Sequence, residues 1–375
     1  MKDDELYDLV TVKRARGGIV RREHLTGKEI SVKSQFRIES GDFLISKRQI
    51  VHGACALVPP EFAGSIVSNE YAVLEANNAI DSLYLAYLSH TPYFQQTCFH
   101  SSIGVHIEKM IFKLDRWFRW EFNIPPLSEQ KKIAEILSTW DAAIETTEKL
   151  LANAEAQKRA LMQQLLTGQR RLKGFGNQLW TTRRLGDCCV GKGSYGANAP
   201  AIEYNGSDPR YLRITDILEN GTLSQTGRVA VPRHLAEGCF LAPGEIVFAR
   251  SGATVGKTYL HQSSEELAYA GYLIKFRPRL DVMDPNFLSH FVRSDQYNKW
   301  VKNTLRAGAQ PNINAVEYSD LKVPCPSIEE QRAICLLLNE FDRQTALHIQ
   351  DREALTLEKA GLMQQFLTGK RRVTV

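Results

Sequence analysis

The chain has 375 residues, more than one hydrophobic core usually organises, so its length predicts two or more domains. Apolar residues make up 43% and charged residues 24% of it, ordinary globular values that exclude a wholly disordered chain. The net charge of +5 suits a nucleic-acid binder and also many soluble enzymes, so charge alone does not choose between these classes.

The cysteines, histidines and N-terminus exclude further classes. The seven cysteines contain no C-x-x-C pair, which predicts reduced thiols rather than a disulfide framework or a zinc site. The nine histidines show no H-x-x-x-H spacing, so we expect no metal site. Residues 1–5 are charged, and no window of about eighteen residues is uninterruptedly apolar. We therefore expect a cytoplasmic protein that does not contact a membrane.

Residues 1–122 carry the pattern of a mixed α/β domain. Short β-branched and aromatic runs such as Phe43-Leu44-Ile45 are separated by glycine, proline, asparagine and aspartate. At the end of this region, residues 117–122 alternate apolar and charged side chains, which predicts a half-buried strand. Core packing of Trp117 and Trp120 is favoured over stacking on nucleic-acid bases.

Residues 123–172 form the first long-helix segment. Between Ile133 and Leu165, apolar residues recur largely at steps of three and four, which marks one face of a helix. Ser128 is suited to cap its N-terminus and Gly168 its C-terminus. Such a helix would be roughly 55–60 Å long at 1.5 Å per residue. Its apolar face therefore needs a packing partner.

The remaining segments repeat this order. Residues 173–179 are a short linker, residues 180–322 a second α/β region, and residues 323–375 a second long helix with a basic tail. The sequence of residues 161–171 returns 201 residues later at 362–372. So long a period indicates duplication of a whole domain with its connector. The economical arrangement of the two helices is an antiparallel coiled coil.

The two α/β regions also align with each other, at an offset of 203 residues. Gly18 matches Gly221 and Gly53 matches Gly256. Residues from about 180 to 208 have no counterpart before Leu6. The first region is therefore expected to lack the opening stretch that the second one has.

Both regions carry a basic residue at the end of a strand, followed by a polar turn. Cations provide affinity for phosphate, and Arg, Lys or Gln can bond base edges in a groove. The candidates for DNA contact in these two turns are Lys47, Arg48, Gln49, His52, Arg250, Ser251, Thr254 and Lys257. A solvated hairpin tip with incidental charge is the open alternative.

A second candidate segment is rich in amide side chains, which can bond adenine bidentately in the major groove. Its residues are Arg306, Gln310, Asn312 and Asn314. Asparagine and glycine are also default turn formers, so a structural role stays open here too. The nearby Gly252–Thr258 stretch is one residue short of a phosphate-binding loop, and its counterpart lacks Lys-Thr, so we expect a turn rather than ATP binding.

The layout resembles the specificity subunit of a type I restriction-modification system. Each long helix opens near a proline and a Glu-Gln pair, at Glu129-Gln130 and Glu330-Gln331, and closes with Leu-Thr-Gly-x-Arg-Arg. Residues 251–257 and 310–314 also resemble family patterns in the second recognition domain. The resemblance covers nearly the whole chain. No catalytic motif is found beside it, which favours a binding protein.

The resemblance implies an α/β (α+β) fold with a pair of duplicated target-recognition domains, joined and spaced by two long helices in an antiparallel coiled coil. Each domain would read one half of a bipartite DNA target, while the helices set the spacing. Two readers on one face of a duplex need a separation compatible with about one helical turn, roughly 34 Å. The implied segments are 1–122 and 180–322 for the domains, 123–172 and 323–375 for the helices, and 173–179 for the linker.

The resemblance also implies partners and a division of labour. The partners would be double-stranded DNA, two modification subunits that methylate adenine, and ATP-driven restriction subunits. S-adenosylmethionine, ATP and magnesium are expected in those chains, with no cofactor and no catalysis in this one. Family members open with a stretch like residues 180–187, which the first region lacks, so reading by that region has less support.

A second hypothesis from another class stays open. The chain could be a coiled-coil scaffold whose duplicated domains bind protein partners without sequence-specific DNA binding. That reading predicts no salt-sensitive DNA affinity and no loss when Arg250 and Lys257 are replaced by alanine.

Overall fold

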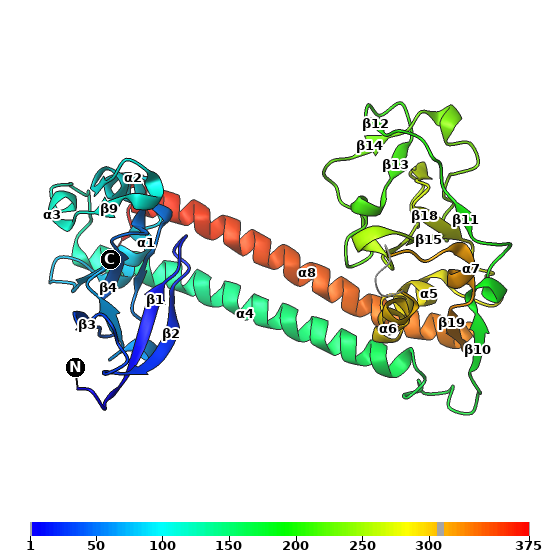
Figure 1. Ribbon diagram of the computed structural model, residues 1–375, viewed down its shortest axis with the longest axis horizontal. Helices are drawn as coiled ribbons and strands as arrows, with labels where there is room; N and C mark the ends of the chain where they lie inside the picture. The colour runs from blue at the N-terminus through cyan, green and yellow to red at the C-terminus, as the bar shows by residue number, and fades with distance from the viewer. Residues whose placement is uncertain (1, 306–310, 375) are drawn as a thin grey trace. The chain divides into compact units, whose positions relative to one another are not determined.

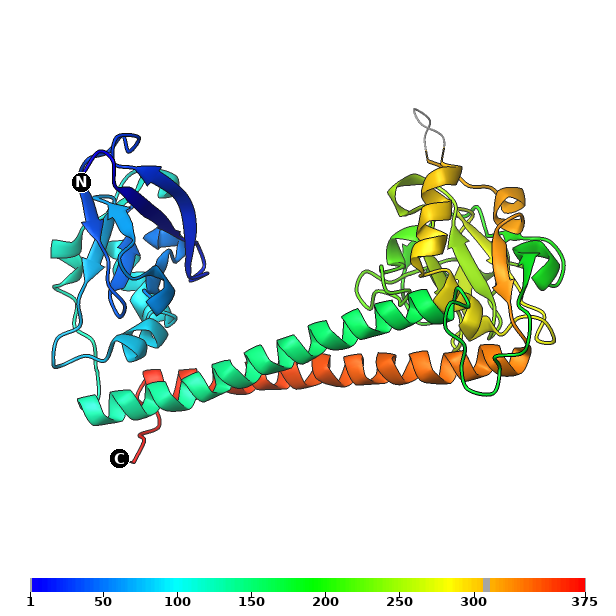
Figure 2. The same cartoon turned by 90° about the horizontal axis from the view of Figure 1, so that it is seen from below.

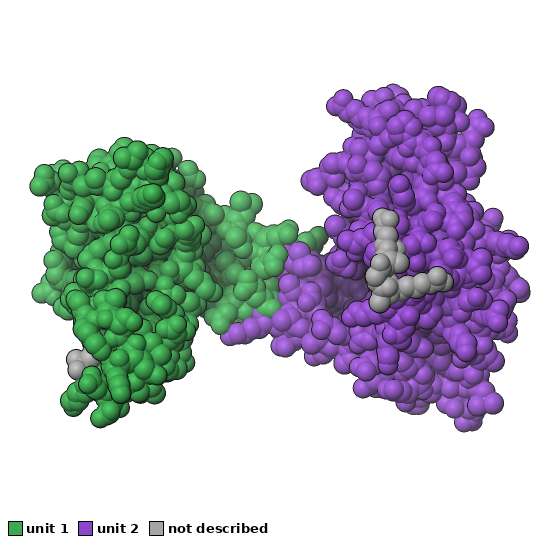
Figure 3. Space-filling view, in the orientation of Figure 1, with its two compact units in different colours: residues 1–148, 350–375 green, residues 149–349 purple. Residues whose placement is uncertain are grey.

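The computed structural model describes residues 2–305 and 311–374. It divides into two compact units (Figures 1 and 3), one formed by residues 1–148 with 350–375 and the other by residues 149–349. We call them unit 1 and unit 2. Each contains part of both long helices, α4 (Leu127–Leu165) and α8 (Ile328–Leu367). The sequence-based boundaries keep each helix whole, and those boundaries stay a prediction. Within the described parts of the chain, no helix has the length and apolar character that a membrane crossing requires.

Unit 1 is built from small sheets and short helices. One sheet has the strand order β2-β1-β6-β3, a second has β5-β4-β7, and β8 pairs with β9. The strands are β1 Leu6–Val12, β2 Ile19–Thr26, β3 Gln35–Arg37, β4 Phe43–Ser46, β5 Cys55–Leu57, β6 Ile66–Ser68, β7 Tyr71–Leu74, β8 Ser102–Ile103 and β9 Ile111–Phe112. The short helices are α1 Ser82–Leu88, α2 Pro92–His100 and α3 Leu114–Trp117.

Unit 2 repeats this plan with additions. Its two larger sheets have the orders β11-β18-β15-β16 and β12-β14-β13-β17, and β10 pairs with β19. The strands are β10 Thr181–Arg184, β11 Ser194–Tyr195, β12 Ile202–Glu203, β13 Arg210–Leu212, β14 Val229–Ala230, β15 Ile246–Ala249, β16 Thr258–Leu260, β17 Leu267–Tyr269, β18 Leu273–Phe276 and β19 Lys322–Cys325. The short helices are α5 Pro285–Phe291, α6 Asp295–Thr304 and α7 Ala315–Ser319.

Equivalent residues build the equivalent cores. The central strands β4 and β15 are buried along their whole length, which explains why both read as continuous apolar runs. Helices α1 and α5 begin at equivalent caps, Asp81 and Asp284, whose carboxylates accept backbone N–H bonds. The structure therefore carries the duplication that the repeated sequence indicates.

The two long helices pack antiparallel within each unit. In unit 1, Ile133 and Leu137 of α4 share a core cluster with Phe366 near the end of α8. In unit 2, Leu165 of α4 shares a core with Leu338 near the start of α8. Ion pairs accompany both contacts, and they link Lys359 to Asp141 in unit 1 and Lys158 to Asp342 in unit 2. The runs of α4 and α8 can be followed in Figure 2.

The repeated Glu-Gln pairs fasten the start of each long helix. The Gln130 side chain accepts from the Asp81 N–H at 2.9 Å and donates to the carbonyls of Ala79 and Pro125, each at 2.9 Å. The Gln331 side chain makes the equivalent three bonds, to Asp284, Val282 and Pro326. Because both glutamines are almost fully buried and satisfied, they fix each helix against the domain in front of it.

The two glutamates bind the basic residue that closes the opposite helix. Arg171 donates two hydrogen bonds of 2.7 Å to Glu330, which also accepts from Trp180 Nε1 at 2.9 Å. Arg372 makes a similar fork to Glu129, which also accepts from the Val373 N–H at 3.0 Å. These bonds, from Arg372 first and then Val373, hold the pKa of Glu129 at about 2.

The predicted strand at residues 117–122 is wrong. Trp117 ends the short helix α3, and residues 118–124 form no strand among the described residues. The burial of Trp117 was predicted correctly, since its ring packs on Phe94 and its Nε1 donates to Thr97 Oγ1 at 3.0 Å. The alternating sequence lacks a neighbouring strand with which to form a ladder.

Candidate nucleic-acid interface

Each of the two candidate turns directly follows a central strand, and its first residue makes an equivalent backbone hydrogen bond. Lys47 follows β4 and Arg250 follows β15. The carbonyl of Lys47 accepts from the Phe112 N–H at 2.8 Å, and the carbonyl of Arg250 accepts from the Ile313 N–H at 2.9 Å. Each turn is therefore tied to the segment that leads into a short helix, α3 in unit 1 and α7 in unit 2.

In unit 2 this tie brings Arg250 beside Asn312. Arg250 Nε donates to Asn312 Oδ1 at 3.3 Å, and Ser251 forms an antiparallel bridge with Asn312. The guanidinium lies over the ring of Tyr195, with Cζ 4.9 Å from the ring centroid. Among the described residues, no carboxylate forms an ion pair with Arg250. A planar cation with unused donors is thus held next to an exposed amide.

The other candidates of unit 2 have mainly structural partners. Asn314 caps α7 by accepting from the N–H groups of Val316 and Glu317. Thr254 Oγ1 donates to the Ser251 carbonyl at 3.3 Å, which closes the turn. Lys257 Nζ lies 2.8 Å from Glu219 Oε1 and also donates to a backbone carbonyl.

Two of the predicted residues, Arg306 and Gln310, lie outside the described residues. The G-x-x-x-G-K-T stretch forms a single 3-10 turn at Gly252–Thr254, as expected of a turn. Within the described residues, no group of His, Cys, Asp and Glu side chains is arranged to hold a metal ion.

In unit 1 the cations of the turn are engaged inside the unit. Arg48 Nε lies 2.5 Å from Glu70 Oε2, and this pairing raises the pKa of Arg48. Lys47 Nζ donates to the Asn69 carbonyl at 2.7 Å. Gln49 Oε1 accepts from Arg14 Nε at 2.8 Å. His52 Nε2 lies 3.2 Å from Glu108 Oε1, without the geometry of a hydrogen bond.

The sequence reasoning missed one aromatic residue of this site. Tyr195, on β11, is 43% exposed, and its hydroxyl accepts from the Ala315 N–H at 3.1 Å. Its ring therefore supports Arg250 while its hydroxyl supports the start of α7. The available signal was a lone tyrosine within Gly193-Ser194-Tyr195-Gly196, but nothing in the sequence pairs it with Arg250.

The arrangement in unit 2 can recognise nucleic acid in two ways. Arginine presents a rigid fork of donors that matches guanine O6 and N7 or a phosphate, and stacking on an aromatic face pre-orients it. Asparagine offers a donor and an acceptor to adenine. Because Arg250 and Asn312 are bonded to each other, they present one combined surface rather than two independent contacts.

Known proteins are similar to this chain over nearly its whole length. A family described as "Type I restriction modification DNA specificity domain" matches residues 4–156 and 177–357. The type I restriction enzyme MjaVIII specificity subunit of Methanocaldococcus jannaschii is 25% identical over 410 aligned residues, which cover 100% of this chain and 88% of that protein.

Solved structures show the same fold. The HsdS subunit from Thermoanaerobacter tengcongensis superposes with a TM-score of 0.52 at 19% identity, covering 98% of this chain and 92% of that one. The type I restriction-modification system S subunit from M. genitalium gives a TM-score of 0.59 at 16% identity, with the same coverage of 98% and 92%. With a family match that spans both duplicated halves, the chain belongs to the family of type I restriction modification DNA specificity domains.

Proposed function

We propose that this chain is the DNA-recognition subunit of a type I restriction-modification complex, in which each α/β domain reads one half of a bipartite target. Family membership supports the role in DNA target recognition. The observation that carries the assignment of the site is the hydrogen bond from Arg250 to Asn312, made while the Arg250 guanidinium lies over the ring of Tyr195. Such a pre-oriented fork beside an amide suits readout of base edges in the major groove.

The long helices have two roles in this proposal. They set the spacing between the half-sites, and they dock two modification subunits, which restriction subunits then join. The buried Glu-Gln pairs support a rigid spacer, because they fix each helix start to a folded domain. S-adenosylmethionine, ATP and magnesium act in the partner chains, and this chain contributes no catalytic group. The complex works in the cytoplasm, where its DNA lies.

The test is a map of modified adenines. The chain is expressed with its cognate modification subunit in a host free of adenine methylation, and modified positions are located across the genome. A split motif with two defined halves is expected. If both proteins are soluble and associate but no adenine is modified, the assignment as a working specificity subunit is wrong.

Variants distinguish this proposal from the scaffold hypothesis. Replacing Arg250 or Asn312 with alanine should relax the methylated motif in one half only, since both residues belong to unit 2. Arg279→Ala, a change at an exposed arginine paired with Asp281, is the matched control and should leave the motif unchanged. A scaffold without DNA readout predicts identical methylation, or none, for all three variants.

A further inference from the structure

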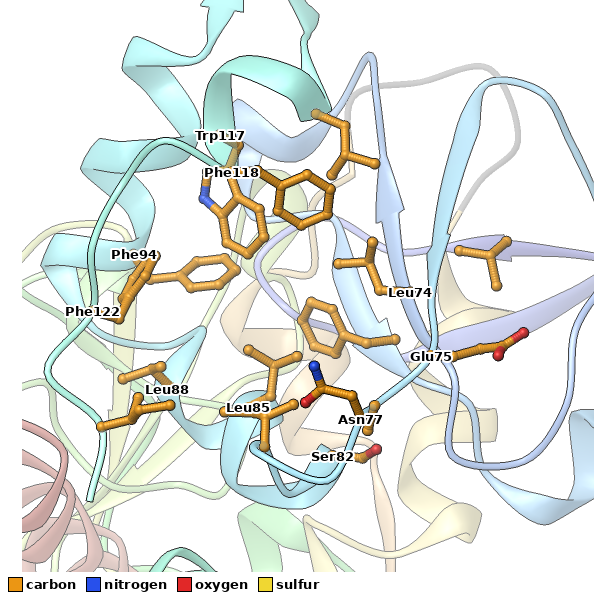
Figure 4. A pocket seen from close by; sticks show the side chains of 16 residues that line it. Leu74, Glu75, Asn77, Ser82, Leu85, Leu88, Phe94, Trp117, Phe118 and Phe122 are labelled. Atoms are coloured by element: carbon orange, nitrogen blue, oxygen red, sulfur yellow. The ribbon is translucent and has the colours of Figure 1, made fainter. Parts of the chain in front are cut away.

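Each unit contains a pocket that the proposed function does not use. The pocket of unit 1 has a volume of about 570 Å³, and Figure 4 shows its largely apolar lining. None of the described residues that line it is a lysine, arginine or histidine. The pocket of unit 2 has a volume of about 470 Å³, and its lining includes the cations Lys257, Arg293 and Lys302. Glu219 is the one carboxylate among the described residues that line it. We call this second pocket the unit 2 basic groove.

Three segments of unit 2 form the walls of the basic groove. They are residues 219–221, residues 253–258 after β15, and residues 292–305 in and around α6. The Tyr297 hydroxyl of α6 donates to the Gly256 carbonyl at 2.9 Å. Gly256 has a φ of +90°, and a Cβ atom there would lie 3.0 Å from Val301 Cγ1. Glycine therefore lets the turn approach the helix closely, and the hydrogen bond holds it there.

The basic groove adjoins the proposed readout site. Arg250 and Lys257 lie at the two ends of one turn, which is closed by a hydrogen bond of 2.8 Å from the Ala249 N–H to the Lys257 carbonyl. Phosphates border the major groove of a duplex on both sides, and contacts to them set the register of a protein that reads bases. Cations beside a base-reading arginine are therefore suited to the DNA backbone.

The internal repeat shows that the equivalent place in unit 1 is filled. At the offset of 203 residues, which also relates the caps of α2 and α6, Arg16 corresponds to Glu219 and Gln95 to Asn298. The Arg16 guanidinium donates to Gln95 Oε1 at 2.7 Å. Gln95 Nε2 in turn donates to the Val51 carbonyl at 2.9 Å. In unit 1 these two side chains join the turn to the helix. In unit 2 their counterparts are an exposed glutamate and an exposed asparagine, and a groove is present instead.

Lys257 and Lys302 are the two cations that the groove can offer to an anion. Arg293, the third, already donates to the carbonyls of Ser289 and Asn220, at 2.9 Å and 3.0 Å. Lys302 is exposed and forms no ion pair among the described residues. A lysine ammonium binds phosphate as a point charge, so two of them on facing walls suit one phosphate group.

Glu219 is the present partner of Lys257. Its Oε1 atom lies 2.8 Å from Lys257 Nζ, and its side chain is 88% exposed. The Lys257 side chain is only 23% exposed and also donates to the Ile217 carbonyl at 3.4 Å. An ion pair with so exposed a partner contributes little to stability. A phosphate can therefore displace the carboxylate while the ammonium stays in the groove.

We propose that the unit 2 basic groove binds a phosphate group of the DNA backbone through Lys257 and Lys302, and that Glu219 competes with that phosphate for Lys257. The inference rests on the proposed function and adds a backbone site to the base-reading pair, Arg250 and Asn312. Phosphate contacts carry no sequence information, so the groove strengthens binding to any duplex and Glu219 weakens it. The competing carboxylate limits the time that the complex spends on unrelated DNA.

The test uses a duplex of unrelated sequence, titrated with the assembled methylating complex over a range of salt concentrations. Lys257→Ala and Lys302→Ala should each weaken binding by roughly threefold and lower the salt slope by about 1. Lys299→Ala, at an exposed lysine of α6 outside the groove, is the matched control and should bind normally. Thermal unfolding checks that each variant is folded.

A double-mutant cycle tests the competition by Glu219. Glu219→Gln should strengthen binding by roughly threefold at low salt, because it removes the competing anion. In the Lys257→Ala background the same change should have almost no effect. Glu237→Gln, at another exposed glutamate of unit 2, is the control for loss of one negative charge. Equal gains in both backgrounds would show that Glu219 only repels DNA at a distance, which would overturn its assigned role.

Two further results would overturn the phosphate site. One is unchanged DNA affinity in folded Lys257→Ala and Lys302→Ala. The other is calorimetric binding of inorganic phosphate to the full chain that Lys257→Ala abolishes without changing DNA affinity, which would identify a free anion as the ligand. The map of modified adenines tests base reading separately. A split motif together with unchanged DNA affinity in both lysine variants would therefore reject the groove and keep the proposed function.

Discussion

Lys47 and Arg250 occupy the same place in the two units, directly after a buried central strand, yet their surroundings differ. In unit 1, Glu70 neutralises Arg48, and the Lys47 ammonium bonds a backbone carbonyl. In unit 2, Arg250 lies on Tyr195 beside an exposed amide. The comparison shows that duplication preserves the backbone turn without preserving the side chains around it. Side chains outside the turn decide whether its cations are available.

The arginine–glutamate pairs at the ends of the long helices should also differ between the units, with the pair in unit 2 contributing more to stability. Breaking that pair gives the largest expected effect. Arg171→Ala leaves the fully buried Glu330 with only Trp180, which should lower the free energy of unfolding by about 3–5 kcal/mol. Arg372→Ala should cost less, because the Arg372 side chain is already 67% exposed. Chemical denaturation measures both, with the exposed Arg170→Ala as control. Equal losses would contradict the difference drawn between the units.

A buried histidine should make unit 2 sensitive to mild acid. Burial, reinforced by Arg293, lowers the pKa of His290 to about 4. Because this histidine takes up its proton near pH 6.5 in the unfolded chain, its contribution to stability should be lost as the pH drops from 6.5 to 4 and should not change further below pH 4. That contribution is roughly 2–3 kcal/mol. His290→Gln should flatten this part of the slope, measured by unfolding across that pH range.

Removing a cation should reduce DNA affinity more in the unit 2 turn than in the unit 1 turn. Arg250→Ala should weaken binding to the cognate duplex by about 1–3 kcal/mol, the size of one good base contact. The measurement is a titration of the assembled methylating complex with DNA variants in each half-site. A uniform loss over both halves would show that Arg250 positions the DNA backbone or supports the fold.

The smallest effect is expected from Arg48→Ala. Since Glu70 already neutralises this exposed cation, its removal should change DNA affinity by less than about fivefold. Removing Glu70 instead, as Glu70→Gln, should free Arg48 and increase the salt dependence of binding. If Arg48→Ala reduces affinity as strongly as Arg250→Ala, the two turns are functionally alike despite their surroundings.

The sequence predicted the repeated and periodic features well. The apolar stripe and the terminal glycines located α4 and α8. The repeated Glu-Gln pairs are buried, and their hydrogen bonds hold the ends of both helices in place. The strand predicted at residues 117–122 failed, because alternation alone does not provide a pairing partner. Tyr195 was missed for a similar reason. Its role depends on a contact across 55 positions of sequence, from 195 to 250, which local pattern does not encode.

The reciprocal glutamate contacts also bear on the order in which the protein is completed during synthesis. Unit 2 is one continuous stretch, residues 149–349, so all of its residues are synthesised before the end of α8. Unit 1 needs residues 350–375, including Arg372 and Val373, to cover Glu129. Domains usually complete in the order of the chain as it leaves the ribosome. Here unit 1 begins first but is completed last. The carboxylate of Glu129 therefore lacks Arg372 throughout translation of unit 2.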